Sequence, residues 1–413
     1  MPAPAGAKKM KNQYKTIRDI KDWSGKRALL REDFNTPQDK SGNITDDSRI
    51  QAALPTLKFL TDAKAKVIIM SHLGRPKGKV SAEFSLKPVA ERLQKVMPGV
   101  KVHFQSEAGP DTWASQLESL ADGEILLLEN MRFFVGEEAN DPDFAKQLAA
   151  LGDVFVNDAF GTAHRAHAST EGVGHHLPVK VAGLLMEAEI EALSSVLNTD
   201  EPLTAIIGGS KVSTKITVLE NLLDKVRYLV IGGGMVFTFL KAEGIETGTS
   251  LVEDDYVDLA AKLLKKAKAS STVTLILPDD LVVADKFDAD ADTQTVDADL
   301  IPDGWMGLDI GPNSIRRLQA ILEKSPHVLW NGPLGVFEMP KFAKGTKAIA
   351  KTIADLTAKG RCESVLGGGD TVAAIEQLGL AHADFTHVST GGGASLEYLE
   401  GKTLPGIAIL DKQ

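Results

Sequence analysis

Short apolar runs, each bounded by polar residues or glycine, recur along the chain and set the strongest limit on its fold. They occupy residues 27–30, 67–70, 125–128, 154–156, 205–207, 229–231, 274–277, 328–330 and 364–366. Runs of this length are typical of parallel strands that are buried on both faces. Between them, apolar residues recur at helical spacings, as at Ile216, Leu219, Leu222, Leu223 and Val226. This alternation predicts an α/β fold in which parallel sheets are flanked by helices.

The length of 413 residues exceeds what one hydrophobic core usually supports, so we expect two domains. The segment 186–197 places Ile190, Leu193 and Leu197 on one helical face, and Pro202 follows soon after it. We interpret residues 186–200 as a helix that connects the domains. No Pro/Gly/Ser-rich linker or short repeat marks the boundary, so the division depends on which residues follow the strands in each half.

Composition excludes several classes of protein. A net charge of -10 argues against a nucleic-acid partner that is bound through a broad positive field. Cys362 is the single cysteine, which excludes an intramolecular disulfide and any Cys-rich zinc or iron–sulfur site. The N-terminal residues lack an apolar signal core, and no apolar run reaches the roughly 18 residues that span a membrane. We therefore expect a soluble cytoplasmic protein without a membrane partner.

In the first half of the chain, arginine and histidine follow the predicted strands. Arginines that follow strands include Arg31, Arg75, Arg132 and Arg165, and eight of the twelve arginines precede residue 176. Because ligands bind beyond the carboxyl ends of parallel strands, we expect these side chains to meet at one rim. Any one of them could form a surface salt bridge, but together they favour a small, multiply charged anion. The histidines at 72, 164 and 167 are poor candidates for metal ligands among so many cations.

Three further residues of this half each have two possible interpretations. Asp33 and Asn35 alternate in an extended segment, so they point to the same side and could hold substrate hydroxyls, or they could form a turn before Pro37. Arg49 lies in the first turn of a helix that we expect Thr45 to cap. Arginine there opposes the helix dipole, so either neighbouring aspartates neutralise it or it faces an anion.

In the second half, glycines follow the predicted strands instead, at 208–209, 232–234, 332, 335, 367–369 and 391–393. Glycine lets backbone amides approach phosphates or a flat base, so several such turns at one sheet edge indicate a nucleotide. Lys211 and Lys215 are four residues apart at the start of a predicted helix, where a polyphosphate would offset their repulsion; otherwise they are solvated lysines. Asp370 is the natural carboxylate for Mg²⁺. Glu338 could accept ribose hydroxyls or be an ordinary loop residue.

Two motifs in this half are false matches. Residues 400–403 resemble the end of a P-loop, but Leu396 occupies the position of the required first glycine. Asp288, Asp290 and Asp292 resemble the start of an EF-hand, but Thr293 replaces its glycine and Asp299 its final glutamate. We interpret the second stretch as a solvated acidic loop.

Taken together, these motifs closely resemble the phosphoglycerate kinase family over nearly the whole chain. The resemblance rests on residues 31–37 (REDFNTP), 71–76 (SHLGRP), 128–132 (LENMR), 158–167 (DAFGTAHRAH), 330–338 (WNGPLGVFE), 367–371 (GGGDT) and 389–394 (STGGGA). It implies two Rossmann-like lobes joined by the interdomain helix. Residues 1–185 would bind phosphoglycerate, residues 201–395 would bind nucleotide, and residues 396–413 would pack back on the N-terminal lobe.

The resemblance also implies an activity, which is reversible Mg²⁺-dependent transfer of the acyl phosphate of 1,3-bisphosphoglycerate to ADP. The products are ATP and 3-phosphoglycerate, in glycolysis, gluconeogenesis or carbon fixation, and a carboxyl group is the phosphate acceptor in the reverse direction. Transfer would be direct and in line after hinge closure, in a monomer. Competing interpretations are a non-catalytic binding protein for RNA phosphate or a sugar phosphate, and a kinase acting on another small acid.

Roles carried over by the resemblance concern three groups of residues. The implied catalytic residues are Arg49, Lys211 and Gly369. The implied substrate-binding residues are Asp33, Phe34, Asn35, Arg49, His72, Arg75, Arg132, Arg165 and His167. The implied nucleotide-binding residues are Gly209, Lys211, Lys215, Gly233, Gly307, Leu308, Asn331, Val336, Glu338, Gly368, Gly369, Asp370 and Thr371, with Asp370 also holding Mg²⁺. The chain departs from the family pattern at Glu32, where an apolar residue is usual. Because side chains alternate along an extended segment, we expect the Glu32 side chain to point away from that of Asp33.

Overall fold

The structure is a computed structural model that describes residues 13–106 and 109–413. The predictions about the extreme N-terminus fall on residues 1–12, outside the described part. Contacts between residues divide the chain into two units. The first unit contains residues 13–191 and 403–413, and the second contains residues 192–402. The predicted functional boundaries at 185, 200 and 395 stay a prediction.

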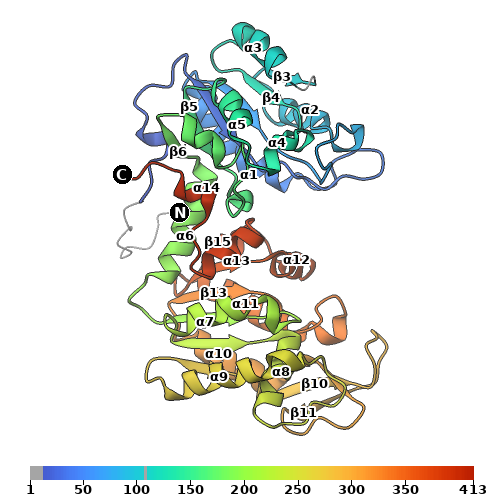
Figure 1. Ribbon diagram of the computed structural model, residues 1–413. Helices are drawn as coiled ribbons and strands as arrows, with labels where there is room; N and C mark the ends of the chain where they lie inside the picture. The colour runs from blue at the N-terminus through green and yellow to red at the C-terminus, as the bar shows by residue number, and fades with distance from the viewer. Residues whose placement is uncertain (1–12, 107–108) are drawn as a thin grey trace. The chain divides into compact units, whose positions relative to one another are not determined.

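The first unit is built on a six-stranded parallel sheet of order β3-β4-β2-β1-β5-β6. Helices precede or follow each strand along the chain (Figure 1). The strands are β1 (Arg27–Arg31), β2 (Lys66–Met70), β3 (Val102–Gln105), β4 (Ile125–Leu128), β5 (Val154–Asn157) and β6 (Lys180–Ala182). The helices are α1 (Ser48–Asp62), α2 (Lys87–Val96), α3 (Pro110–Ser119), α4 (Val135–Glu138), α5 (Pro142–Ala149) and α14 (Pro405–Ala408).

The second unit has a six-stranded parallel sheet of order β15-β14-β13-β7-β8-β9 and a separate three-stranded antiparallel sheet of order β11-β10-β12. The parallel strands are β7 (Leu203–Ile207), β8 (Tyr228–Ile231), β9 (Thr274–Ile276), β13 (His327–Asn331), β14 (Glu363–Gly367) and β15 (His387–Val388). The antiparallel strands are β10 (Asp280–Ala284), β11 (Thr293–Asp297) and β12 (Met306–Ile310). The helices are α7 (Ile216–Leu223), α8 (Val236–Ala242), α9 (Val257–Ala269), α10 (Pro312–Leu322), α11 (Lys344–Ala358), α12 (Gly369–Gln377) and α13 (Gly393–Leu399).

The prediction of an α/β fold with two parallel sheets is confirmed, but the antiparallel sheet was not predicted. The stretch interpreted as a solvated acidic loop contains β11, which pairs with β10. Its residues are mostly exposed, because β11 is an edge strand that packs little against the core. An exposed strand rich in threonine and acidic residues has the composition of a loop, which explains the error.

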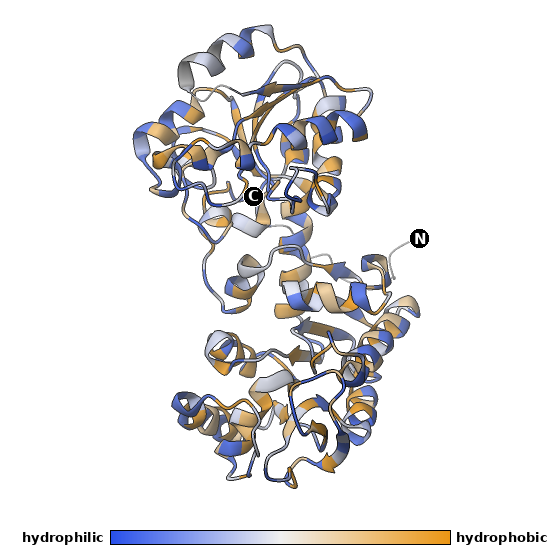
Figure 2. Cartoon of the chain, turned by 90° about the vertical axis from the view of Figure 1, so that its right-hand side faces the viewer, coloured by the Kyte–Doolittle hydropathy of each residue, from blue (hydrophilic) through white to orange (hydrophobic). Residues whose placement is uncertain are grey.

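Burial on both faces explains why the strands read as continuous apolar runs. On β1, Ala28 and Leu30 join one buried cluster, whereas Leu29 joins another, as the two-residue period of a strand requires. Figure 2 shows the complementary pattern on the helices, which carry both hydrophobic and hydrophilic residues. None of the helices in residues 13–106 and 109–413 is long and apolar enough to cross a bilayer.

The helix α6 (Leu184–Leu197) carries the chain from the first unit into the second. It begins two residues before the predicted helix 186–200 and ends three residues earlier. Residues 403–413 return to the first unit, where Gly406 donates its N–H to the Ala163 carbonyl at 2.8 Å. The Asn157 amide donates to the Gly406 carbonyl at 2.8 Å. These bonds attach the last segment of the chain to the loop after β5.

Cys362 provides a test of the second unit's core. Its side chain is buried, and burial together with Glu363 raises the pKa of the thiol to about 12. At pH 8 the thiolate fraction is therefore about one in ten thousand in the folded protein. We expect a thiol reagent such as DTNB to label Cys362 very slowly in native protein and rapidly in denaturant. Fast stoichiometric labelling of native protein would contradict this packing.

Candidate functional site

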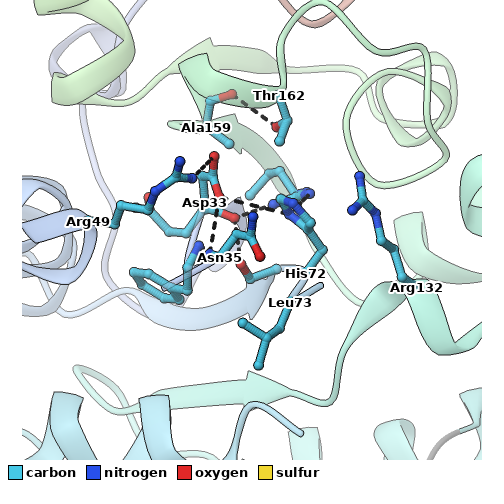
Figure 3. A network of polar contacts seen from close by, with 12 residues as sticks. Asp33, Asn35, Arg49, His72, Leu73, Arg132, Ala159 and Thr162 are labelled. Atoms are coloured by element: carbon cyan, nitrogen blue, oxygen red, sulfur yellow. Dashed lines mark hydrogen bonds and ion pairs between the residues drawn. The ribbon is translucent and has the colours of Figure 1, made fainter. Parts of the chain in front are cut away.

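The first unit gathers its predicted site residues at the carboxyl ends of its strands. Asp33 and Asn35 follow β1, His72 follows β2 and Arg132 lies beyond β4. Figure 3 shows Asp33 between Arg49 and His72, with Arg132 on the other side of the imidazole. We call the set Arg49, His72, Arg75, Arg132, Arg165 and His167 the basic cluster.

Arg49 is the second residue of α1 and forms an ion pair with Asp33. The prediction that it lies in the first helical turn is confirmed, but Thr45 is not the cap. Asp47 occupies the cap position, and its carboxylate instead binds Arg92 at 2.7 Å. Thr45 donates its hydroxyl to the Pro37 carbonyl at 3.2 Å, because it lies three residues before the helix begins. The Arg49 side chain remains one-third exposed, so it can also meet a ligand.

Asp33 is an ionised group surrounded by cations. Burial opposes its ionisation, but His72, Arg49 and Arg31 outweigh that effect and lower the pKa of Asp33 to about 2. Its Oδ1 also accepts the Asn35 N–H at 3.2 Å. Asn35 Oδ1 in turn accepts the Gly74 N–H at 2.9 Å. The segment therefore forms the turn before Pro37 and also presents a carboxylate beside Arg49, while the binding of substrate hydroxyls stays a prediction.

His72 is held as a neutral hydrogen-bond donor. It is 4% exposed, and burial together with neighbouring arginines lowers its pKa well below 6.5. The Arg31 guanidinium lies 3.2 Å from His72 Nδ1. Because a guanidinium can only donate, Nδ1 must accept, and the imidazole proton is on Nε2. Near neutral pH the charges that compensate Asp33 are therefore those of the arginines.

Arg31 and Phe34 do not lie at the rim, contrary to the expectation from sequence. Arg31 is 1% exposed and donates from Nε to Ser169 Oγ at 2.8 Å. Phe34 is fully buried in the core, and its N–H donates to Ser71 Oγ at 2.9 Å. Strand alternation alone could not show this, because the loops after β1 and β5 fold over both residues. Phe34 therefore anchors the loop and presents no exposed atom to a ligand.

The remaining members of the basic cluster repel one another. Arg132 is 5% exposed and donates to the Gly74 carbonyl at 2.7 Å, while burial and the charges of Arg165 and Arg31 lower its pKa. Burial and the same arginines lower the pKa of His167 to about 4. Arg75 is exposed. Arg132 also pairs with Glu138 at 3.3 Å, so its charge is partly compensated, and an anion would stabilise the neighbouring cations further.

In the second unit, backbone atoms from three loops come into close contact. Gly332 has a φ of +98°, and a Cβ there would lie 2.2 Å from the Gly208 carbonyl oxygen. Gly233 has a φ of +68°, and a Cβ there would lie 2.5 Å from the Gly209 carbonyl oxygen. Side chains at these positions would push the loops after β7, β8 and β13 apart. The result is an edge lined by backbone.

Lys211 and Lys215 are arranged differently from the prediction. Lys211 precedes a 3-10 turn at Val212–Thr214, and Lys215 precedes α7, so they do not share one helical face. Lys211 is exposed, whereas Lys215 is partly buried and donates to Asn331 Oδ1. The pKa of Lys215 is lowered, because the effect of burial exceeds the opposing effect of the Asp370 and Glu400 charges. The Asn331 Nδ2 group is buried without a hydrogen-bond partner.

At the start of α12, one residue adjoins open space and another is buried. A Cβ on Gly369 would meet no atom within 4 Å, and Gly368 has a φ of +91°. Asp370 is exposed in the first turn of α12. Thr371, by contrast, is fully buried, accepts the Gly332 N–H at 2.6 Å and donates to the Gly367 carbonyl at 2.8 Å. Its hydroxyl therefore joins two loops, and the expectation that it lines phosphates does not fit this structure.

The other predicted nucleotide residues surround the end of β12. Val336 donates its N–H to the Leu308 carbonyl at 2.9 Å, and both side chains belong to one apolar cluster. Gly307 is required beside Phe237, because a Cβ there would lie 2.2 Å from the ring. Glu338 is exposed nearby in the chain. This surface offers apolar contacts and one carboxylate.

A magnesium site built from protein groups alone does not occur in the described residues, which contain no cluster of three or more His, Cys, Asp or Glu side chains suited to a metal. The residues present fit a cation that is held mainly by phosphates. Asp370 supplies one exposed carboxylate next to open space at Gly369. Mg²⁺ commonly takes one or two carboxylates and completes its shell with phosphate oxygens and water.

Sequence reasoning missed two acidic partners of these residues, of which one is buried and the other partly exposed. Glu137 is fully buried and accepts the Ser169 hydroxyl at 2.6 Å, which places a negative charge behind Arg31. Glu253 accepts the Ser213 hydroxyl at 2.6 Å and lies near Lys211. Neither acid has a local pattern that distinguishes it from a surface residue, so only the fold reveals its role.

Comparison with known proteins gives a consistent result. The family model described as phosphoglycerate kinase matches residues 17–402. A phosphoglycerate kinase of Acaryochloris marina is 57% identical over 401 residues, covering 96% of this chain and 99% of that protein. Cytosolic phosphoglycerate kinase 3 of Arabidopsis thaliana is 54% identical over 392 residues, covering 95% of this chain and 96% of that protein.

A solved structure agrees with these matches. The phosphoglycerate kinase of Coxiella burnetii aligns with a TM-score of 0.87 at 43% identity, covering 96% of this chain and 98% of that one. The sequence motifs, the two parallel sheets and the relatives all lead to one assignment. The chain belongs to the phosphoglycerate kinase family.

Proposed function

We propose that this kinase transfers the acyl phosphate of 1,3-bisphosphoglycerate to Mg-ADP and catalyses the reverse reaction on 3-phosphoglycerate. The observation that carries the proposal is the basic cluster, in which Arg49 and Arg132 lie near a neutral histidine donor, His72, and Arg165 adds positive charge beside Arg132. An acid with a phosphate at one end and a carboxylate at the other supplies the missing negative charge. A coupled assay of ATP-dependent phosphorylation of 3-phosphoglycerate, with other small acids as controls, tests the substrate.

In this proposal each unit binds one substrate. In the first unit, Asp33 and Asn35 hold the glycerate part, and His72, Arg75, Arg132, Arg165 and His167 hold the phosphate that is not transferred. In the second unit, Gly307, Leu308 and Val336 contact the base, and Glu338 binds the ribose. The phosphates are bound by Lys215, Asn331 and the glycine loops. The support is that the first set includes the exposed Arg75 and the partly exposed Asp33, Asn35, Arg165 and His167, and that the second set forms a backbone-lined edge.

The proposed chemistry is direct in-line transfer. Phosphoryl transfer depends mainly on positioning and on positive charge around the equatorial oxygens of the transferred group. Arg49, Lys211 and the exposed backbone at Gly369 supply that charge. Mg²⁺, when bound at Asp370, would neutralise phosphate charge. No nucleophilic side chain is needed, so we propose that no phosphoenzyme forms, that the enzyme works as a monomer and that it resides in the cytoplasm.

Replacing Arg49 tests its role in the reaction. If Arg49 acts mainly in the transition state, Arg49→Ala should lower kcat by roughly three decades with a smaller change in KM. Arg92→Ala is the matched control, because Arg92 is also partly exposed and paired with an aspartate. Steady-state kinetics of both variants decide the matter, and an Arg49→Ala enzyme within tenfold of wild type would remove Arg49 from the mechanism.

The protonation state of the two site histidines gives a second test. Lowered pKa values mean that His72 and His167 stay neutral as the pH falls through 6.5, and His167 gains its proton near pH 4. NMR titration of the unliganded protein should therefore show both imidazoles titrating well below pH 6.5. A titration of His72 near pH 6.5 would mean that it binds anions as a cation instead.

Transfer also requires the two bound substrates to meet. We propose that the two units close when both are occupied, which would exclude the water that hydrolyses an acyl phosphate. Small-angle scattering should show a smaller radius of gyration with 3-phosphoglycerate and a non-hydrolysable Mg-ATP analogue together than with either alone. Identical curves in all states would contradict closure.

A further inference from the structure

Two acidic side chains lie buried next to each other in the first unit. Arg31 of β1 pairs in register with Asn157 of β5, so the residues that follow, Glu32 and Asp158, are neighbours across the two strand ends. Glu32 is 1% exposed and Asp158 is fully buried, and Glu32 Oε1 and Asp158 Oδ2 are buried oxygens with no other hydrogen-bond partner, so there the two neighbouring carboxyl groups can bond only to each other. A carboxylate cannot donate a hydrogen bond, so one member of the pair must carry a proton.

The surrounding donors identify Glu32 as the protonated member. Asp158 Oδ1 accepts the Met186 N–H at 3.0 Å, and the Leu185 backbone and the Thr56 hydroxyl lie near its carboxyl group, so these donors partly offset the rise that burial causes in the pKa of Asp158. These donors and the N-terminus of α6 favour an ionised Asp158. Burial raises the pKa of Glu32 well above its ordinary value, and the charge of Asp158 raises it further. Glu32 therefore donates and Asp158 accepts.

Other charges near the pair are already engaged. Arg31 favours ionisation of Glu32 and Asp33 opposes it, while Arg31 also faces the buried Glu137. On the first turn of α6, Glu187 is paired with Arg18. Besides Asp158, the charged side chains that act on Glu32 include Arg31 and Asp33, and His72 in turn acts on Asp33. The helix α6 also carries Glu187 and the fully buried Glu189.

The contact between Asp158 and α6 is tight. A Cβ on Gly183 would lie 2.2 Å from Asp158 Oδ1, so only glycine allows the carboxylate to reach the helix. Thr56 accepts the Leu184 N–H at 2.9 Å beside it. The start of α6 is thus held by α1 and by Asp158, and Asp158 is held by Glu32.

We propose that Glu32 and Asp158 share one proton at neutral pH and act as a positioning pair that ties the segment carrying Asp33 to the first turn of α6. Glu32 directly precedes Asp33, so movement of one backbone position shifts the other. Loss of the proton would place two negative charges side by side without water, and the pair would separate. Substrate binding should then weaken as the pH becomes alkaline. The kinetic part rests on the proposed function, whereas the shared proton does not.

Proton counting tests the pair without reference to activity. Unfolding in guanidinium at pH 7 exposes Glu32 to water, where it ionises, so wild type should release about one more proton per chain than Glu32→Gln. A sensitive pH electrode in unbuffered solution measures the release. The control is Glu91→Gln on α2, an exposed glutamate that should leave the count unchanged. Equal release by wild type and Glu32→Gln would overturn the shared proton.

Kinetics then test the positioning role. Glu32→Val removes the donor, and the KM for 3-phosphoglycerate should rise about tenfold, with a smaller change in kcat. Glu32→Gln keeps an N–H donor to Asp158, so KM should stay near the wild-type value and lose its alkaline rise. An unchanged KM in Glu32→Val would overturn the positioning role, even with the proton count as expected. If Glu32→Val does not fold, equal alkaline KM profiles for wild type and Glu32→Gln would overturn it.

Discussion

The site of the first unit depends on the burial of one guanidinium. Arg31 lies under the loops that follow β1, β2 and β5, and Ser169 joins it to the equally buried Glu137. Removing either charge would leave the other buried without compensation, which costs about 3–5 kcal/mol. The same guanidinium sets the tautomer of His72. One buried cation therefore fixes both the shape of the loops and the donor that they present.

The second unit is built differently. In the proposed function it binds a polyphosphate and a flat base, which require close approach of the backbone more than they require charge. Its loops meet backbone to backbone at Gly208 and Gly332, and Thr371 bridges Gly332 and Gly367. These contacts make the edge rigid without filling it with side chains. Positive charge near this edge comes from the partly buried Lys215 and the exposed Lys211.

Sequence alone predicted the parallel sheets and the residues that follow their strands, because buried strands and ligand-binding turns have local signatures. It did not predict β11, since an exposed edge strand lacks an apolar pattern. It placed Arg31 and Thr371 at a surface, although both are buried. It could not find the roles of Glu32 or Glu137, because a buried acid is defined by partners far away in the chain. The chemistry of local motifs could be predicted from the sequence, whereas the burial of individual side chains could not.

The return of residues 403–413 to the first unit has a consequence for biosynthesis. The amide of Asn157, the last residue of β5, and the carbonyl of Ala163 in the following loop both bind Gly406. Near the edge strand β6, Asp411 donates its N–H to the Lys180 carbonyl at 2.9 Å. These partners leave the ribosome after the entire second unit has been made. The unit translated first thus cannot complete its own hydrogen bonding until residues 403–413 have been made, whereas residues 192–402 need no later segment to close their sheets.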